Sequence, residues 1–523
     1  MKRDLFIPFL CYWAVPVLLC CALPVLSYLY FPQTLLFDDA AFTLKYVDNL
    51  LAGHGYRFNA SDPEPVFGSS SFPYTLLAAG IKPFLPASWA DVYFIHMRIG
   101  SLLGYALFLF LAFCVGKQIG GWSGGMLSLF AVGHFPEYFI YADSGLETAF
   151  AGFLLAISFY VFYVGKHSRV IYVCCALFAL AKHNYYSAAY ILACAELWMC
   201  WQTEPRNQRG AIRDFSLFFL LPTLGFLVFC YLYFGNVLPN SLYAKIFFLP
   251  KAAGAFPYFT YFGESIYLVP VIISLLPIGF LLAAGSLRRL RIPFRFFVVL
   301  LAALVLLGQV LALSKVEIHD WYFVNPTLAM QFVGLFAFIE IFRQQRANFR
   351  SWWPYLVLGL YLFFHLVPYF ARVDYEKPDI RFRNMLAGHL RQVRLLYTTL
   401  ETEKREVGRY LRQAGAPEQV VLVAHGWTAY ESGMKAVDLT GINSKEVLRL
   451  NLHYLKILEA FEPDFVALQE FNFAVFPYAY HLVHISKECM PYDRRFWQVW
   501  KRKPAAHYLP FKSIRQIIPR FAR

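Results

Sequence analysis

Charged side chains are scarce in this sequence, since only 15% of its 523 residues are Asp, Glu, Lys or Arg. A soluble globular protein has about 25%. Hydrophobic residues make up 59% of the chain and aromatic residues 19%. This composition excludes a soluble globular enzyme, a disordered chain and a fibrous repeat.

The ten cysteines lack the spacing of a metal site or of a disulfide framework. Most lie in or beside apolar runs, and Cys489 lies in the polar tail without a local partner. No CxxC or Cys/His spacing occurs, so neither zinc nor disulfides are expected. The sequence also lacks a P-loop, a Rossmann fingerprint, an HExxH motif and a nucleophile elbow.

Long apolar runs recur over the first 370 residues, and many are long enough to cross a bilayer as a helix. The first run, 5–30, has no small-residue cleavage site and is interpreted as a retained helix. The sequence therefore predicts a polytopic α-helical membrane protein with about 11 transmembrane helices. The predicted spans are about 7–30, 94–115, 122–141, 146–165, 170–183, 185–201, 214–234, 262–284, 295–314, 322–342 and 352–370. Gly116, Gly120 and Gly124 predict a tight turn with close packing between the second and third spans.

The net charge of +14 is interpreted as a topology signal rather than as a nucleic-acid surface. Basic residues cluster in four short loops, at 166–169, 206–213, 288–295 and 343–350. With two helices over 170–201, all four loops fall on the same side as the basic N-terminus, as the positive-inside rule requires. One helix over 170–201 would place the later loops outside. The two-helix interpretation is favoured, and it puts Lys182, His183 and Asn184 at the outer tip of a hairpin.

The chain is predicted to divide into a transmembrane domain, 1–372, and an extracytoplasmic soluble domain, 373–523. The second part begins with a charged helical stretch, 379–413. Short β-rich runs at 420–423, 436–439 and 465–468 then alternate with helical patterns near 445–460, which is typical of a small α/β domain. Residues 494–523 hold nine Lys or Arg and no Asp or Glu, interleaved with aromatic residues. This tail fits either an interfacial amphipathic segment or an ordinary basic terminus.

The first outer loop carries an adjacent acidic pair, Asp38 and Asp39. Two carboxylates at the outer end of a membrane helix are costly unless they are solvated or used. Their mutual repulsion favours a proton acceptor or donor near neutral pH, so catalysis or metal binding is one interpretation. N-capping of a helix that starts near Ala40 is the alternative, and it accounts for only one of the two.

Further polar candidates lie on the same predicted face. Glu147 just inside a span is a functional candidate, but Ser144 three residues earlier also fits a capping box. Lys182, Lys245 and Arg57 together could neutralise a phosphate, and snorkelling to the interface is the alternative for each. The remaining candidates for substrate binding are Glu64, Asn240, Tyr243, His319, Asp320 and Tyr322.

Several of these segments resemble the GT-C class of membrane glycosyltransferases, and among them the terminal arabinofuranosyltransferase group (AftB-like enzymes and related pilin arabinosyltransferases). In the first loop the similarity lies in Asp38-Asp39-Ala40, in Gly53-x-Gly55 before Phe58-Asn59, and in Glu64-x-Val66-x-Gly68. It continues through Ser144–Ala149, Pro239–Lys245 and Trp321-Tyr322-Phe323-x-x-Pro326 to Tyr430–Gly433, Val437–Asn443 and Pro463-Asp464.

The chain departs from the group's pattern at two places. Lys182-His183-Asn184 stands where the group has Arg-Pro-Glu, so the role of that carboxylate is not carried over. Ser69–Phe72 replaces a Thr-Ser/Asn-x-Leu-Trp pattern, which leaves the acceptor contacts open.

The resemblance implies an inverting transfer of a sugar from a polyprenyl-phosphate donor to a glycan or protein acceptor. It implies a multi-pass protein of the bacterial cytoplasmic (inner) membrane, with the chemistry and the C-terminal domain on the outer face. Asp39 or Asp38 would act as the base, and Lys245, Lys182, His54 and Arg57 would stabilise the leaving phosphate. For the second Asp two roles remain open: it would orient the substrate or hold a divalent cation (Mg or Ca).

Other functions remain as alternatives. A protein mannosyltransferase or an aminoarabinose transferase would share this architecture. A flippase or transporter would predict charges in mid-span or two related halves, and neither is found. A membrane scaffold would leave the acidic pair and the outer-face cations unexplained.

Overall fold

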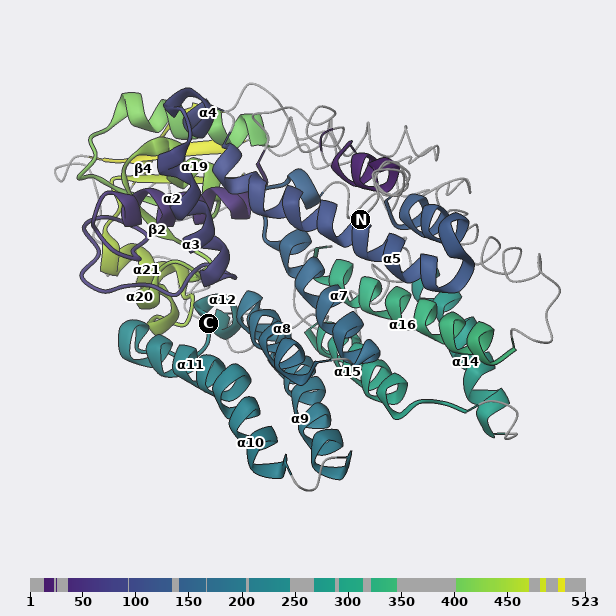
Figure 1. The fold of residues 1–523 in the computed structure, drawn as a ribbon. Coiled ribbons are helices and arrows are strands. Elements are labelled where there is room, and N and C mark those ends of the chain that lie inside the picture. The colour runs from purple at the N-terminus through teal and green to yellow at the C-terminus, as the bar shows by residue number, and fades with distance from the viewer. Residues whose placement is uncertain are drawn as a thin grey trace.

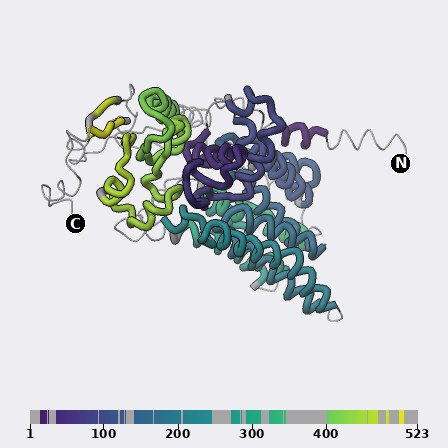
Figure 2. Tube along the Cα trace, turned by 90° about the vertical axis from the view of Figure 1, so that its left-hand side faces the viewer, coloured from purple at the N-terminus to yellow at the C-terminus, as the bar shows by residue number. Residues whose placement is uncertain are grey.

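The computed structural model describes residues 14–22, 25, 36–92, 94–133, 141–165, 167–203, 207–244, 268–286, 291–313, 321–345, 401–469, 480–485 and 497–503. Within these ranges, long helices form one body and an α/β domain lies at one end of it (Figures 1 and 2). The helices are α2 (Asp38–Leu51), α3 (Phe72–Ile81), α4 (Ala87–Val92), α5 (Ile95–Gly133), α7 (Thr148–Val164), α8 (Ser168–Ala181), α9 (Tyr186–Thr203), α10 (Gln208–Phe215), α11 (Leu221–Phe234), α12 (Asn240–Tyr243), α14 (Leu268–Ser286), α15 (Phe294–Leu313), α16 (Trp321–Gln345), α19 (Gly426–Ser432), α20 (Lys445–Arg449) and α21 (Tyr454–Phe461). Shorter helical turns are η1 (Lys82–Phe84), η2 (His183–Tyr185) and η4 (Ser216–Leu220).

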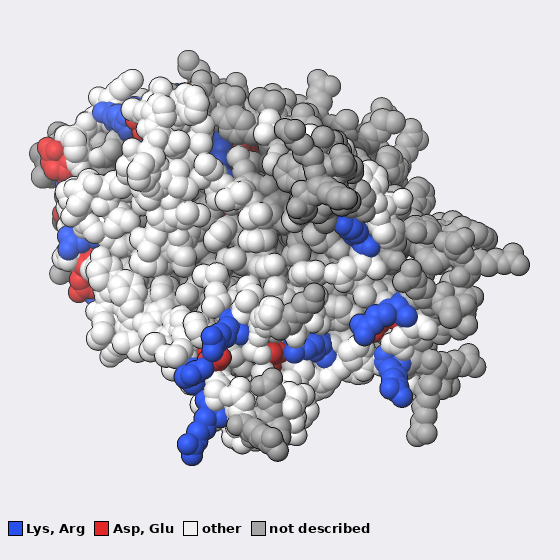
Figure 3. Space-filling model, in the orientation of Figure 1, with Lys and Arg blue, Asp and Glu red and all other residues white. Residues whose placement is uncertain are grey.

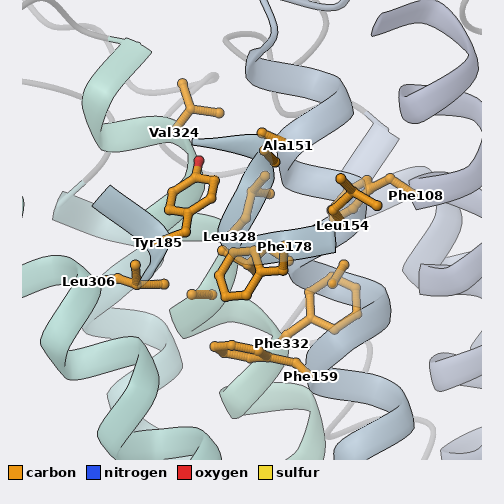
Figure 4. Packing of buried hydrophobic residues seen from close by; sticks show 14 of the residues in the cluster. Phe108, Ala151, Leu154, Phe159, Phe178, Tyr185, Leu306, Val324, Leu328 and Phe332 are labelled. Atoms are coloured by element: carbon orange, nitrogen blue, oxygen red, sulfur yellow. The ribbon is translucent and has the colours of Figure 1, made fainter. Parts of the chain in front are cut away.

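Apolar helices occupy most of the predicted spans. Four helical segments in the described part are long and apolar enough to cross a bilayer: Ile95–Gln118, Gln208–Phe234, Phe294–Leu311 and Tyr322–Ile341. Helices α7, α8 and α14 are also apolar and coincide with predicted spans. Aromatic and aliphatic side chains from α5, α7, α8, α15 and α16 interdigitate in the core between them, as Figure 4 shows around Phe159, Phe178 and Phe332. The predicted span 352–370 lies outside the described residues.

Helix α5 reverses direction at the glycine-rich segment where the sequence predicts a tight turn. Gly121 has a φ of +60°, in the left-handed region. A Cβ at Gly116 would lie 2.5 Å from the carbonyl oxygen of Gly124 and would also meet the hydroxyl of Ser128. Residues eight apart in a straight helix are separated by about 12 Å, so this contact requires a hairpin. The predicted turn is confirmed.

The segment 168–203 forms two helices, α8 and α9, joined through η2, as the charge pattern predicts. Residues of the basic loops form ion pairs at one end of the helical body. Arg169 pairs with Asp214 at 2.7 Å, and Arg295 pairs with Glu196 at 2.7 Å. Figure 3 shows several Lys and Arg along this lower edge, whereas the visible surface above it is mostly uncharged. The α/β domain and α2 lie at the opposite end (Figure 1).

Residues 401–503 build a five-stranded mixed sheet in the order β2-β1-β3-β5-β4. Its strands are β1 (Val420–Val423), β2 (Lys435–Asp438), β3 (Phe465–Gln469), β4 (Tyr480–Ile485) and β5 (Trp497–Arg502). The first three run parallel, β5 runs antiparallel to β3, and β4 runs antiparallel to β5. Strands β1, β2 and β3 lie where the sequence predicts them.

Alternation along the strands gives the sheet two buried faces. Val421, Val423 and Phe465 face the helix at 401–414 and the aromatic residues of α2. Leu422 and Val466 face α20 and α21. The sheet is therefore covered on both sides, and on one side its cover includes helix α2.

Strand β5 corrects the interpretation of the basic tail. Residues 497–502, expected in an interfacial segment or a basic terminus, pair with β3 and β4 instead. Val499 is buried, and Trp500 packs against the core beneath α20 and α21. A short run that mixes aromatic and basic residues fits a strand as well as an amphipathic helix, which is why the sequence-based interpretation was wrong. Residues 504–523 lie outside the described residues.

The hairpin in α5 makes Gly116→Ala a test of the fold. The added methyl group collides with the backbone of Gly124, so the free energy of unfolding should fall by about 1–3 kcal/mol. Thermal unfolding of the detergent-solubilised chain measures the loss. Gly225→Ala in α11 is the matched control, since no atom lies within 4 Å of the point that its new methyl group would occupy. Equal stability of the two variants would contradict the hairpin.

Candidate functional site

The two adjacent acids at the start of α2 face different parts of the molecule. Helix α2 begins at Asp38, and Phe37 at its N-cap makes no side-chain cap. Successive residues of an α-helix point about 100° apart. Asp38 therefore faces the α/β domain, whereas Asp39 lines a pocket on the other side. Neither Asp is the N-cap that the alternative interpretation proposed.

Asp38 joins the α/β domain to α2 through hydrogen bonds and an ion pair. Its carboxylate accepts hydrogen bonds from the backbone N–H of Trp427 at 3.0 Å and from Nδ1 of His425 at 3.0 Å, and Lys404 Nζ lies 3.5 Å away. Burial alone would raise the pKa of Asp38, but the charges of Lys404 and His425 and these hydrogen bonds hold it well below its usual range. Burial raises the pKa of the neighbouring Glu401 to about 8, so Asp38 is the main counter-charge of Lys404 at neutral pH.

The interface around Asp38 is tightly packed. A Cβ at Gly426 would collide with the carbonyl oxygen of Asp38, so only glycine allows α19 to approach α2 this closely. The indole N–H of Trp427 donates to the carbonyl of Leu36 at 2.9 Å, and the Arg405 guanidinium lies 4.5 Å above the Trp427 ring. These contacts place α19 directly on the first turn of α2.

A second contact covers the open edge of the sheet. Asn59 pairs with both backbone groups of Ala436 on edge strand β2, at 2.9 and 3.0 Å. Lys45 donates to the Asn59 side chain at 3.0 Å and lies 4.5 Å from the centre of the Phe58 ring. Burial lowers the pKa of Lys45 to about 8. The Phe58-Asn59 pair of the first loop thus joins the two parts of the molecule.

The Asp39 pocket has a volume of about 50 Å³ and draws its walls from distant parts of the chain. Helix α2 contributes Asp39, and the loop at 68–70 contributes small residues. The starts of α7 and α16 and the end of α8 contribute Glu147, Tyr322 and Lys182. The full lining is Asp39, Phe42, Thr43, Gly68, Ser69, Ser70, Leu146, Glu147, Lys182, Ser241, Tyr322 and Ile442.

A buried ion pair forms one wall of this pocket. Lys182 Nζ lies 2.8 Å from Glu147 Oε1, and both side chains are less than a tenth exposed. Ser70 Oγ donates to the same Glu147 oxygen at 2.9 Å, and the Lys182 ammonium lies 5.1 Å from the centre of the Tyr322 ring. Glu147 does not complete a capping box with Ser144, because its carboxylate turns to Lys182 and Ser70. That alternative is wrong.

Ser241 adds a polar group to the pocket that the site prediction missed. Its hydroxyl is buried and, among the described residues, has no hydrogen-bond partner. The backbone N–H of Asn240 donates to the carbonyl of Phe67 at 2.8 Å and fixes the start of α12 beside the loop at 68–70. A bound ligand in this pocket would find the Ser241 hydroxyl available.

The other predicted site residues lie elsewhere. His54 is exposed, Arg57 is half-buried, and neither lines the Asp39 pocket. Glu64 lies on a separate cavity, where it pairs with Lys445 at 3.2 Å. Tyr243 belongs to α12 next to the pocket-lining Ser241, and Asn240 is fully buried. Lys245, His319 and Asp320 lie outside the described residues.

The surroundings of Asp38 do not fit a divalent cation. Its oxygens are already occupied by Trp427, His425 and a lysine ammonium, and a second cation there would be repelled. Within the part of the chain that the structure describes, no three His, Cys, Asp or Glu side chains are grouped as metal ligands.

The fold and this pocket define a class: a polytopic helical membrane protein with a polar pocket where its helices meet an α/β domain. Two solved structures share the fold, those of ArnT from Cupriavidus metallidurans bound to undecaprenyl phosphate and in the apo state. Each matches with a TM-score of 0.55, over 95% of this chain and 99% of ArnT, at 12% and 11% sequence identity. ArnT belongs to the GT-C class, so the expected GT-C fold is confirmed; the AftB-like subgroup is not singled out.

Residues 391–508 match a family described as "Domain of unknown function (DUF8728)", which covers the α/β domain. No curated protein sequence matches the chain.

The Asp38 interface generates the first test of this site. Asp38→Asn removes the counter-charge of buried Lys404, and breaking such a pair costs about 3 kcal/mol or more. We expect a lower free energy of unfolding at pH 7 and faster proteolysis within residues 401–503. Because the folded pKa of Asp38 is lowered, its contribution is present at neutral pH and is lost as the pH falls below about 4. The difference in free energy of unfolding between Asp38→Asn and the wild type should therefore become smaller below that pH. Asp91→Asn is the exposed control, and an equal effect of both substitutions would contradict the interpretation.

The buried pair generates the second test. Lys182→Gln leaves the Glu147 carboxylate buried without its partner, which costs about 3–5 kcal/mol. Glu147→Gln with Lys182→Gln removes both charges and should recover most of that loss. A double-mutant cycle on the free energy of unfolding measures the coupling. Additive single effects would show that the two side chains do not depend on each other.

Proposed function

We propose that this protein is a glycosyltransferase that uses a polyprenyl-phosphate sugar as donor. One observation carries the proposal: Asp39, the Lys182–Glu147 pair and the Ser241 hydroxyl line a single pocket. The shared fold supports it, since ArnT is a GT-C glycosyltransferase and one of its structures contains undecaprenyl phosphate.

Asp39 is assigned as the general base. An acceptor hydroxyl attacks C1 of the donor sugar, and its proton passes to the Asp39 carboxylate as the new bond forms. The bond from C1 to the phosphate oxygen breaks, and the polyprenyl phosphate leaves with both electrons of that bond. Attack opposite the leaving group inverts the configuration at C1. A phosphate leaves without being protonated, so one catalytic carboxylate is sufficient.

Lys182 is assigned to the phosphate. Its ammonium keeps donors beyond the one used by Glu147, and it lies where water is largely excluded, so its hydrogen bonds to an oxyanion are strong. Glu147 cancels the charge of Lys182, however, and a phosphate needs further positive charge. Of the other cations proposed for this from the sequence, His54 and Arg57 do not line the pocket, and Lys245 lies outside the described residues, where it stays a prediction.

The distribution of charge supports an assignment of the side of the membrane. Basic residues lie at one end of the helical body, and α2 and the α/β domain lie at the other (Figures 1 and 3). Under the positive-inside rule the pocket and the α/β domain face the outside of the bacterial inner membrane. Transfer would then occur on that outer face.

Arabinofuranose is the proposed sugar because of the motif resemblance in the first loop, and the acceptor is a glycan or a protein. The likeness to ArnT favours an aminoarabinose transferase as the second candidate. Both use the same pocket and the same base, and they differ only in the sugar.

The test uses bacterial membranes that contain the full chain and supply the acceptor, with polyprenyl-phosphate-linked arabinofuranose, aminoarabinose and mannose as donors. Consumption of each donor is followed by mass spectrometry. We expect one donor to be consumed and Asp39→Asn to reduce its consumption by about 10²–10⁴-fold, the usual contribution of a general base, with no change in thermal stability. Asp91→Asn, an exposed acid outside the pocket, is the matched control.

Three outcomes can be told apart. If no donor is consumed, the proposed function is wrong. If Asp39→Asn retains full activity, the base assignment is wrong. If aminoarabinose alone is consumed, the second candidate replaces the first.

A further inference from the structure

The α/β domain and the first outer loop enclose a second cavity, of about 120 Å³, which has no role in the chemistry assigned above. The loop contributes residues between Asn59 and Val66. The domain contributes residues of β2, of α20 and of the two positions before α20, Asn443 and Ser444.

We propose that this cavity binds uncharged sugar units of the acceptor glycan, at a distance from the reacting hydroxyl. The proposal rests on the glycosyltransferase function and extends it to the class of acceptor. Its basis is the mixture of donors, acceptors and an apolar ring on the walls of one cavity between the two parts of the protein.

The charges that line the cavity balance. Lys435, Lys445 and Arg449 are matched by Asp62, Glu64 and Glu446. Lys445 and Glu64 pair across the cavity at 3.2 Å, while Arg449 and Glu446 are exposed on α20. A phosphate or a sulfate would be attracted to cations but repelled by three carboxylates. An uncharged polyhydroxylated ligand has no such conflict, because carboxylates accept from its hydroxyls and cations donate to them.

The remaining lining groups also suit a sugar. Asn443 is buried at the back of the cavity and is held by Asp438, which accepts from its backbone N–H at 3.0 Å and from its side chain at 2.9 Å. Phe461 and Pro63 offer apolar surface of the kind that packs against the C–H face of a sugar ring. Polar groups held in place and an apolar wall are the usual features of a pre-formed ligand site.

One thin partition separates this cavity from the Asp39 pocket. Val66 lines the cavity and Gly68 lines the pocket, and in the opposite wall Asn443 lines the cavity and Ile442 lines the pocket. Two residues of extended chain span about 7 Å. This separation is short enough for one oligosaccharide to occupy the cavity and to place a terminal hydroxyl near Asp39.

The experiment measures binding to the full chain in phosphatidylcholine nanodiscs, which avoids sugar-based detergents. The probes are short uncharged oligosaccharides of arabinofuranose, mannose and glucose, with inorganic phosphate and a sulfated oligosaccharide as anionic probes. Arg449→Ala and Glu446→Ala alter the cavity from its exposed side. Arg412→Ala and Glu418→Ala, exposed residues of the same domain away from the cavity, are the matched controls.

We expect an uncharged probe to bind, with an affinity at least about tenfold lower in Arg449→Ala and Glu446→Ala and unchanged in both controls, a loss of about 1.4 kcal/mol or more. Binding should persist in Asp39→Asn, because that residue lies beyond the partition. The proposal is overturned if no uncharged probe binds, if only anionic probes bind, or if the cavity variants and the controls behave alike. Donor consumption is measured separately, so a chain that binds oligosaccharides but consumes no donor refutes the transferase function and keeps the glycan site.

Discussion

The contact of Asp38 with Trp427, His425 and Lys404 is the interaction on which the arrangement of the site depends. It seats the α/β domain on the first turn of α2, where Gly426 permits close approach. Because consecutive helical residues diverge by about 100°, fixing Asp38 against the domain turns Asp39 into the pocket. Two acids that look equivalent in the sequence thus take separate duties, one in docking and one at the pocket.

The pocket itself is built on a second buried charge pair. Taking Lys182 and Glu147 out of water is costly, and the pair persists because Ser70 and the Tyr322 ring complete its surroundings. Such a pair contributes little net stability, but each charged group holds the side chain of the other in one orientation. The ends of α7 and α8 are held together at the wall that faces Asp39, which is the preorganisation that charge stabilisation in a transfer reaction needs.

Much of the architecture follows from local patterns, whereas the division of roles does not. Apolar runs and basic loops predict the helices, the glycines of α5 predict its hairpin, and β-branched runs predict β1 to β3. Asp39, Glu147, Lys182 and Tyr322, chosen separately, line one pocket. The docking role of Asp38 escapes prediction because its partners lie more than 360 residues away and leave no local signal. Ser144 and Glu147 have capping-box spacing, but a buried lysine competes more strongly for the carboxylate than a backbone N–H does. Strand β5 escapes prediction because a short run that mixes basic and aromatic residues fits either a strand or an amphipathic helix.

The pocket is complete only when the α/β domain is docked on α2. Ile442 belongs to that domain yet lines the pocket, and the neighbouring Asn443 accepts a hydrogen bond from Tyr46 of α2 at 3.0 Å. At Gly68 a Cβ would collide with the side chains of Asn443 and Tyr46, so a glycine is required there for the loop to close over Asp39. Loss of the Asp38 contacts would therefore open a wall of the pocket without touching the reacting atoms. In the proposed transfer reaction Asp38 would act as a positioning residue, with its effect transmitted through Ile442 and Gly68.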